Sequence, residues 1–391
     1  MLKLRWLGAR KAAAGIAAAA ALAVVATAVP ALADPPAGAG GKAVVPASFD
    51  MVGVGSNTDD GLFNQLTADY DKTIAASEHG ASHPYFYSFN ATKPGSTSTA
   101  PTKIVTKSGC ASIVRPNGSG PGLKALDNNT PDGKGTSCLD FARSSSGPSA
   151  TSPKDGPGGV VYVALAEDAV TYATRDTGAT KTVPATYAPK SLTVAQLKKI
   201  FLCTDTNWKQ VGGANQPIKA YLPQPGSGTL SFWLKALGIT TAGSCVSETL
   251  EENQGLSKQF NSPNAIFIYS VADWIAQKYH SAACTATPTK AQNKFGCDQV
   301  GFLGLDKIGG VSPVTTAKVP TINAAFKSTG FTRTIYDIVR YSTATADHIP
   351  ATLDPFFANK GRHGYVCTNA TAVAAIVDYG FLPSTTCGSG S

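Results

Sequence analysis

Short apolar runs and helical stripes of apolar residues alternate along most of the chain. Strands are predicted at four apolar runs, which span residues 49–54, 159–165, 218–222 and 335–340. Helices are predicted to begin near residues 62, 123, 193 and 228, with another over 370–377. The run at 159–165 has almost no polar residue, which is typical of a strand buried on both faces. This alternation predicts an α/β architecture with mostly parallel sheets.

Three segments repeat one local pattern, in which a strand ends, a turn of glycine and hydroxyl residues follows, and a helix begins. They are Gly53–Thr58, Gly118–Gly122 and Gly226–Thr229. A helix N-terminus has unpaired N–H groups and a partial positive charge, and glycine lets a ligand approach the backbone. Serine and threonine add hydroxyl donors, so the pattern favours a small oxyanion. The alternative is that these residues are ordinary helix caps and turns.

The N-terminus is basic and then apolar, and it contributes half of the formal net charge of +8. Residues 1–11 hold four basic residues, an Ala/Val/Leu run spans 12–29, and Ala31-Leu32-Ala33 follows. This order predicts a signal peptide (1–33) cleaved after Ala33, rather than a membrane anchor, since Pro30 closes a weakly apolar stretch. Beyond it, 29 basic and 25 acidic residues leave a net charge of +4. No dense basic stripe appears, which argues against a nucleic-acid partner.

The segment after the predicted cleavage site indicates an exported protein without a membrane anchor. Residues 34–47 are rich in Pro, Gly and Ala and are predicted to be a linker. No cysteine adjoins the cleavage site, so we expect no lipid anchor. No later apolar run reaches the roughly 18 residues of a spanning helix. We therefore expect a secreted protein, either extracellular or periplasmic.

Eight cysteines follow the leader, and an even number in an exported chain indicates disulfides. We expect neighbours in the sequence to pair, as Cys110–Cys138, Cys203–Cys245, Cys284–Cys297 and Cys367–Cys387. No C-x-x-C spacing occurs, so a metal site is not predicted, and no cofactor is expected.

Two catalytic arrangements are alternatives to a binding site. A serine hydrolase elbow requires G-x-S-x-G, and neither Gly118-Ser119-Gly120 nor Gly226-Ser227-Gly228 has that spacing. A triad assembled in space stays open, because sequence spacing does not test it. Glu251 and Glu252 form an adjacent acidic pair, for which a solvated helix face is the expected reading.

The three turns also carry a family resemblance. Gly53-Val54-Gly55-Ser56, Gly118-Ser119-Gly120-Pro121-Gly122 and Gly226-Ser227-Gly228-Thr229 resemble, in order and spacing, the phosphate-binding protein of bacterial ABC phosphate importers. Residues 193–213, with their Asn-Trp turn, resemble a helix of the same family, and the likeness spans roughly residues 49 to 345. The resemblance implies a two-lobe periplasmic-binding-protein-like fold of class II type, with a hinge and a ligand cleft between the lobes. It places residues 48–165 and 331–391 in lobe 1 and 166–330 in lobe 2.

Carried over position by position, the resemblance implies a set of ligand-binding residues. They are Ser56, Thr58, Ser119, Gly120, Ser145, Ser227, Gly228 and Thr229. Two positions depart from the family, which has an aspartate where Ser145 stands and an arginine where Pro223 stands. The aspartate would accept the proton of phosphate, so its absence bears on selectivity. Arg143 is expected to supply a fork of donors instead, with a structural ion pair as the alternative.

These observations favour a secreted, non-enzymatic solute-binding protein that captures phosphate or a similar small oxyanion for ABC-type import. The resemblance implies an importer permease as partner, and we expect a monomer. A second reading keeps the fold but gives it a different ligand, as an extracellular binding or surface module. The absent aspartate, arginine and lipid anchor motivate that reading, and a secreted serine hydrolase is the most distant one.

Overall fold

The computed structural model describes residues 44–93, 100–128, 137–149, 152, 156–180, 182–279, 300–358 and 363–390. The predicted leader, residues 34–43 of the predicted linker and the expected Cys284–Cys297 disulfide lie outside these residues.

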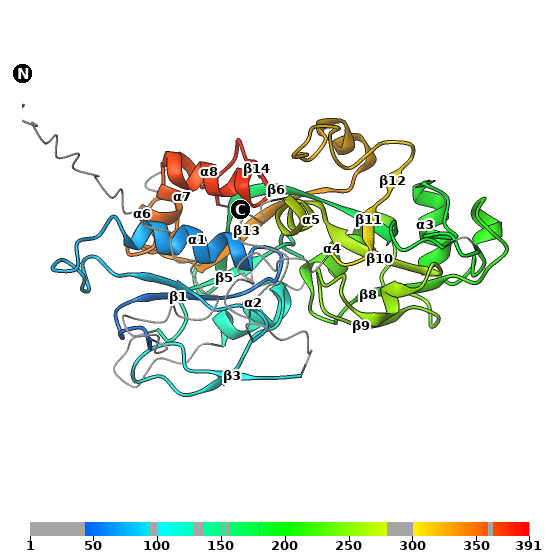
Figure 1. The fold of residues 1–391 in the computed structure, drawn as a ribbon. Helices are drawn as coiled ribbons and strands as arrows, with labels where there is room; N and C mark the ends of the chain where they lie inside the picture. The colour runs from blue at the N-terminus through cyan, green and yellow to red at the C-terminus, as the bar shows by residue number, and fades with distance from the viewer. Residues whose placement is uncertain are drawn as a thin grey trace, which may run out of the picture.

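One ten-stranded sheet runs through the molecule (Figure 1). Its main path is β2-β1-β5-β13-β6-β10-β8-β9, and β11 and β14 pair with β6 beside this path. In that order, the strands are Phe86–Ser88, Met51–Gly55, Phe141–Ser144, Thr332–Arg340, Val160–Arg175, Ala265–Ser270, Lys219–Pro223 and Ser247–Leu250, with β11 at Leu303–Leu305 and β14 at Leu382–Pro383. Short two-stranded pairs lie outside it, namely β3 (Lys103–Ile104) with β4 (Ile113–Val114), and β7 (Ser191–Leu192) with β12 (Lys307–Ile308).

The sheet is parallel at both ends and antiparallel at its centre. Strands β2, β1 and β5, which we call the first half, are parallel, and so are β10, β8 and β9, the second half. Between them, β13 pairs antiparallel with β5 and β6, and β6 pairs antiparallel with β10. The expectation of mostly parallel sheets therefore holds only within each half. The centre differs because β6 and β13 run between the halves in opposite directions.

Helices cover both halves of this sheet. Helix α1 (Asp60–Asp71) packs on α8 (Ala370–Asp378), which packs on α7 (Tyr365–Thr368), and α6 (Asp354–Phe357) lies beside them. The others are α2 (Ser119–Asp127) in the first half, and α3 (Val194–Phe201), α4 (Gly228–Leu237) and α5 (Val271–Tyr279) in the second. Among the described residues, short 3-10 helices span Trp208–Val211, Lys258–Asn261 and Ala324–Thr329. Within the described residues, no helix combines the length and apolarity needed to cross a membrane.

The helix predicted to begin near residue 193 is confirmed as α3, and a capping box forms its start. The Thr193 hydroxyl accepts a hydrogen bond from the Gln196 backbone at 3.2 Å, and the Gln196 side chain accepts one from the Thr193 backbone at 2.8 Å. Each bond satisfies a donor that the first helical turn leaves unpaired. The helix then buries Leu197, Ile200 and Phe201.

The two faces of β1 belong to two hydrophobic clusters. Val52 and Val54 point into the smaller cluster with Leu126, whereas Met51 joins the larger one, which continues into the second half. Full burial of one such side chain stabilises the fold by about 1.5–3 kcal/mol. Aromatic rings fill the larger cluster under the first half, and the rings of Phe86 and Phe356 stack at 4.4 Å between centroids. Burial on both faces explains why this strand carries no polar side chain.

Three of the expected disulfides are confirmed. They are Cys110–Cys138, Cys203–Cys245 and Cys367–Cys387. The closed segments span sequence separations of 28, 42 and 20 residues. Each disulfide joins cysteines that are neighbours in the sequence, so it restricts one local segment of the unfolded chain.

Stability should fall as the pH rises from about 4 to about 8, in part because of Asp71. Its carboxylate accepts a hydrogen bond from Phe86 N at 2.8 Å, and burial raises its pKa from 3.8 to about 8. The folded chain thus keeps a proton that the unfolded chain has already lost. We expect Asp71→Asn to raise the free energy of unfolding at about pH 9 by about 1 kcal/mol or more, the equivalent of one pKa unit, with little change at about pH 4.

Chemical denaturation at both pH values checks this expectation. The exposed residue Glu78 supplies the control, because Glu78→Gln removes a carboxylate from the same region without changing a buried group. An equal effect of Asp71→Asn at both pH values would contradict the assignment of this proton to Asp71.

Candidate functional site

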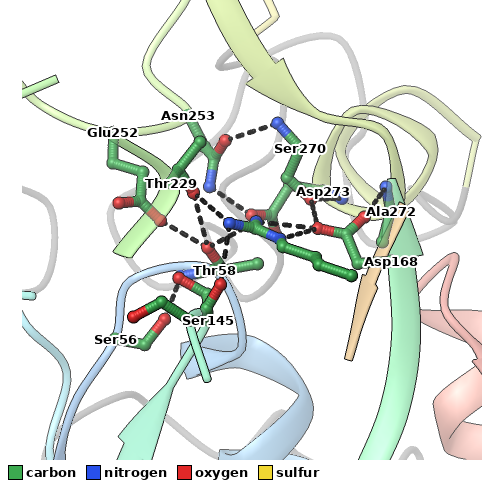
Figure 2. Close-up of polar contacts among 12 residues, drawn as sticks. Ser56, Thr58, Ser145, Asp168, Thr229, Glu252, Asn253, Ser270, Ala272 and Asp273 are labelled. Atoms are coloured by element: carbon green, nitrogen blue, oxygen red, sulfur yellow. Dashed lines mark hydrogen bonds and ion pairs between the residues drawn. The ribbon is translucent and has the colours of Figure 1, made fainter. Parts of the chain in front are cut away.

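Hydroxyl side chains from three turns meet between the two halves of the sheet (Figure 2). Thr58 follows β1, Ser145 follows β5, and Ser227 and Thr229 lie at the start of α4. Thr58 Oγ1 and Thr229 Oγ1 are 3.3 Å apart, although 171 residues separate them. Together with Ser119 these residues form the hydroxyl cluster, and all of its members are buried. The structure thus brings together the turns that the sequence singled out.

Ser119 joins the cluster from the first residue of α2. Its hydroxyl accepts a hydrogen bond from Ser145 N at 3.0 Å and lies 3.3 Å from Ser145 Oγ. Gly228 packs against both serines so closely that a Cβ atom there would overlap their hydroxyls. Gly120 N donates to Gly226 O at 3.1 Å, so the second and third turns touch through their backbones. Glycine is required at position 228 because only a residue without a side chain permits this approach.

Two helix N-termini lie at the hydroxyl cluster. Ser227 caps α4, where its Oγ accepts a hydrogen bond from Leu230 N at 3.0 Å, and Ser119 opens α2. The first N–H groups of a helix lack intrahelical partners and carry partial positive charge. Acidic residues are absent from the first turn of both helices. The local field of these two helix starts therefore favours a negative group.

Ser56 shapes the first turn instead of joining the cluster. Its hydroxyl accepts a hydrogen bond from Thr58 N at 3.2 Å, which is a local contact within the turn. Its carbonyl oxygen accepts two hydrogen bonds from Arg143, at 3.2 Å and 3.1 Å. The position of Thr58 therefore depends on Ser56 and on the guanidinium behind it.

Arg143 is fully buried behind the first turn. Besides Ser56, its guanidinium contacts Asp60, Ser88 Oγ and the carbonyl of Phe89, all in the first half. Nε also lies 3.8 Å from Asp59, whose pKa burial raises to about 6 while the guanidinium opposes the rise. Arg143 thus forms the structural ion pair that the sequence left as an alternative to ligand contact.

Arg333 contacts the hydroxyl cluster, and no local motif in the sequence marks it as a site residue. Nη1 donates to Thr229 Oγ1 at 2.9 Å and to the carbonyl of Ser145 at 3.0 Å, and Nη2 donates to Thr58 Oγ1 at 3.3 Å. One guanidinium therefore contacts residues from both halves. The only signal in the sequence is its place in β13, where it shares the buried alternate positions with Ile335 and Asp337.

Asp168 holds this guanidinium from the neighbouring strand. The two residues face each other in the register of β13 and β6, with Nη2 and Nε of Arg333 at 2.8 Å and 3.0 Å from one carboxylate oxygen. Ser270 Oγ and Ala272 N donate to the same carboxylate at 3.0 Å and 3.1 Å. Each charge of the buried pair thus has several partners, which offsets part of the cost of desolvation.

Glu251 and Glu252 are buried at the cluster, so the expected solvated helix face is wrong. They follow β9 in an irregular segment, and both side chains reach residues of the first half. Glu252 accepts hydrogen bonds from the hydroxyls of Thr58 and Ser227. Glu251 accepts one from Asn117 Nδ2 at 2.8 Å, and burial raises its pKa to about 7. The expectation of a solvated face depends on a helix at these two residues, and the structure has an irregular segment there.

Two further buried carboxyl groups lie close to the arginines. Burial raises the pKa of Asp273 well above its usual value, and the charges of Asp168 and Glu252 add to the rise. Burial likewise raises the pKa of Asp337, whose oxygens have no hydrogen-bond partner among the described residues. Burial thus favours the protonated form of both groups, which limits the negative charge around the site.

Among the described residues, no hydrogen bond joins a histidine side chain to the hydroxyl cluster. Ser227 donates to Glu252, while His79 and His348 contact Asp50 and Tyr341 elsewhere in the fold. In the part of the chain that the structure describes, no group of three or more histidine, cysteine or carboxylate residues is placed to hold a metal ion. What the cluster offers is a set of hydroxyl, guanidinium and helix N-terminal donors.

Comparison with known proteins gives one family match. The model of the PBP superfamily domain matches residues 87–345. No curated protein matches the sequence. Among solved structures, the chain is similar to a Clostridium perfringens protein named as a phosphate ABC transporter substrate-binding protein with bound phosphate. The identity is 14% and the TM-score 0.51, with 86% of this chain and 100% of that chain covered. It is also similar to an ABC-type phosphate transport receptor from Vibrio cholerae, at 17% identity and a TM-score of 0.49, with 85% and 99% covered.

Removal of either Arg333 or Asp168 alone should strongly destabilise the fold, because the other charge then stays buried without its partner. We expect Arg333→Gln to lower the free energy of unfolding by about 3–5 kcal/mol, because it leaves a buried carboxylate without its cation. Adding Asp168→Asn to the same protein should recover part of that loss. Chemical denaturation of the two single variants and the double variant measures this coupling.

Lys235 provides the control for charge, since Lys235→Gln removes a cation from an exposed position of α4. Additive losses in the double variant would show that the two residues stabilise the fold independently.

Proposed function

The chain belongs to the PBP superfamily, and on that premise we propose that it is a solute-binding protein that captures phosphate or a similar small oxyanion for ABC-type import. The observation that carries this proposal is the convergence of Thr58, Ser145 and Thr229 on Arg333 from both halves of the sheet. This is a set of donors suited to an anion, and the proposed activity is binding and release.

We assign direct ligand contacts to the hydroxyl cluster and to the backbone of Gly120 and Gly228, which lie in the first turns of α2 and α4. Helix N-termini and hydroxyls hold an oxyanion by hydrogen bonds and dipoles, with little need for net charge. Arg333 adds positive charge behind these donors. Ser56 and Arg143 have a positioning role in this proposal, because they fix the turn that presents Thr58.

Phosphate is the first ligand to test, since the Clostridium perfringens relative was solved with bound phosphate. Arsenate and sulfate share its tetrahedral shape and differ in their protons and size. Comparing the three therefore separates recognition of shape from recognition of a proton.

We further propose that the two halves act as lobes, with residues 48–165 and 331–391 in one and 166–330 in the other. Both boundaries fall in or beside the strands β6 and β13, which connect the halves. Bending of these two strands would open and close the cleft around the hydroxyl cluster. Hinges of this kind depend on a few residues at the crossing strands.

An exported location and a permease partner complete the proposal. We place the mature chain after Ala33, outside the cytoplasm, as a monomer without a lipid anchor. The disulfides among the described residues support this location, because disulfides persist in oxidising compartments. The partner would be the permease of an ABC importer.

Titration calorimetry with protein freed of ligand tests the proposed site. We expect phosphate to bind, and Ser227→Ala or Thr229→Ala to weaken binding by about 1–3 kcal/mol, the range for a hydrogen bond to a charged group. Ser328→Ala is the control, because this serine is exposed in the 3-10 helix Ala324–Thr329.

Two results would count against the proposal. Absence of heat and of a thermal shift at millimolar phosphate, arsenate and sulfate would reject an oxyanion ligand. Unchanged phosphate affinity in both variants would move the ligand away from the hydroxyl cluster.

A further inference from the structure

Glu252 contacts the hydroxyl cluster as a carboxylate of the chain itself. It is buried, with 3% of its surface exposed, and accepts a hydrogen bond from Thr58 in the first half (Figure 2). It accepts a second hydrogen bond from Ser227 in the second half. We propose that Glu252 is an internal competitor, whose carboxylate and the external oxyanion bind the same two hydroxyls in exchange. This inference rests on the proposed function and adds Glu252 as the residue that sets the affinity of the site for the oxyanion.

The count of hydrogen atoms makes the two anions mutually exclusive. A serine or threonine hydroxyl has one hydrogen to donate. Thr58 donates its hydrogen to Oε1 of Glu252, and Ser227 donates its hydrogen to Oε2. Neither hydroxyl then has a hydrogen left for a second acceptor. An oxyanion that receives these hydrogens must therefore displace the carboxylate from both.

The backbone around Glu252 is fixed, so displacement requires rotation of the side chain alone. Glu252 N donates to Gln224 Oε1 at 3.2 Å. On its other side, Asn253 accepts a hydrogen bond from Ser270 N at 3.1 Å and donates to Asp273. These contacts hold the segment against β10 and α5 whichever way the Glu252 carboxylate points.

The charges around Glu252 also favour exchange over joint occupancy. Burial raises the pKa of Asp59, Glu251 and Asp273, and the charge of Glu252 adds to each rise. Arg333 donates to Thr58, one of the two hydroxyls that bond Glu252, and Asp168 pairs with Arg333. Arg333 is the cation of the cluster, and Asp168 already neutralises it. A carboxylate and an oxyanion on the same hydroxyls would repel each other, and among the described residues no further cation contacts these hydroxyls to separate them.

Removal of the competitor should strengthen ligand binding. We expect Glu252→Ala to raise the affinity for phosphate at least about tenfold, measured by titration calorimetry. Glu252→Gln keeps the shape of the side chain and should raise it in the same direction, which guards against loss of fold in the alanine variant. Glu248→Ala, on β9 four residues away, is the matched control and should leave the affinity unchanged.

A second measurement does not depend on phosphate. Acetate should stabilise Glu252→Ala against thermal unfolding, compared with chloride at equal ionic strength, because it replaces the missing carboxylate on Thr58 and Ser227. Wild type and Glu248→Ala should not respond. Acetate rescue without phosphate binding to any of the proteins would reject the proposed function and retain Glu252 as the occupant of an anion site.

Other outcomes would contradict the proposal that Glu252 competes with the oxyanion. Weaker phosphate binding in both Glu252 variants would make the carboxylate a partner of the ligand. Equal affinity in all proteins, or no response of Glu252→Ala to acetate, would show that the carboxylate does not occupy the site of the oxyanion.

Discussion

Arg333 and Asp168 face each other across the two central strands of the sheet, with 2.8 Å between the guanidinium and the carboxylate. Removing two charges from water costs several kcal/mol for each ion, so the pair needs further partners to be tolerated. Asp168 finds them in Ser270 and Ala272, and Arg333 finds them in the turns after β1 and β5 and at the start of α4. The partners that make the pair tolerable are therefore those that assemble the site. Stability and binding geometry depend on the same contacts here.

The region around this pair contains more carboxyl groups than cations, yet it is proposed to hold an anion. Burial reduces the conflict, since it raises the pKa of Asp273 and Asp337 and so favours the neutral form of both groups. Arg143 is likewise matched by Asp60. The remaining donors are hydroxyls and helix N-termini, which act through dipoles. The low fraction of charged residues in the chain, 15%, agrees with such a site.

Features set by neighbouring residues could be predicted from the sequence, and contacts between distant segments could not. The capping box of Thr193 and the serine cap of α4 depend on residues within one helical turn, and the neighbouring cysteines pair over short loops. Arg333 and Glu252 reach the cluster through the tertiary fold, and neither carries a local motif. Arg143 had the right residue type for a ligand contact, but the direction of its side chain follows from burial among Asp59, Asp60 and two carbonyl oxygens. The residue types in the sequence therefore indicated which chemical groups the site contains better than which residues form it.

The length of β6 limits which insertions and deletions this chain can accept during evolution. Its 16 residues pair with β13 and β14 on the first half and with β10 and β11 on the second. Side chains alternate between the faces of a strand, so one inserted or deleted residue inverts every side chain beyond it. Such a change between Ala166 and Asp168, where β6 pairs with β13 without a register shift, would turn Asp168 away from Arg333. Replacement of single residues at the ends of the strands can alter the preferred ligand, whereas this part of β6 cannot change in length without separating the ion pair.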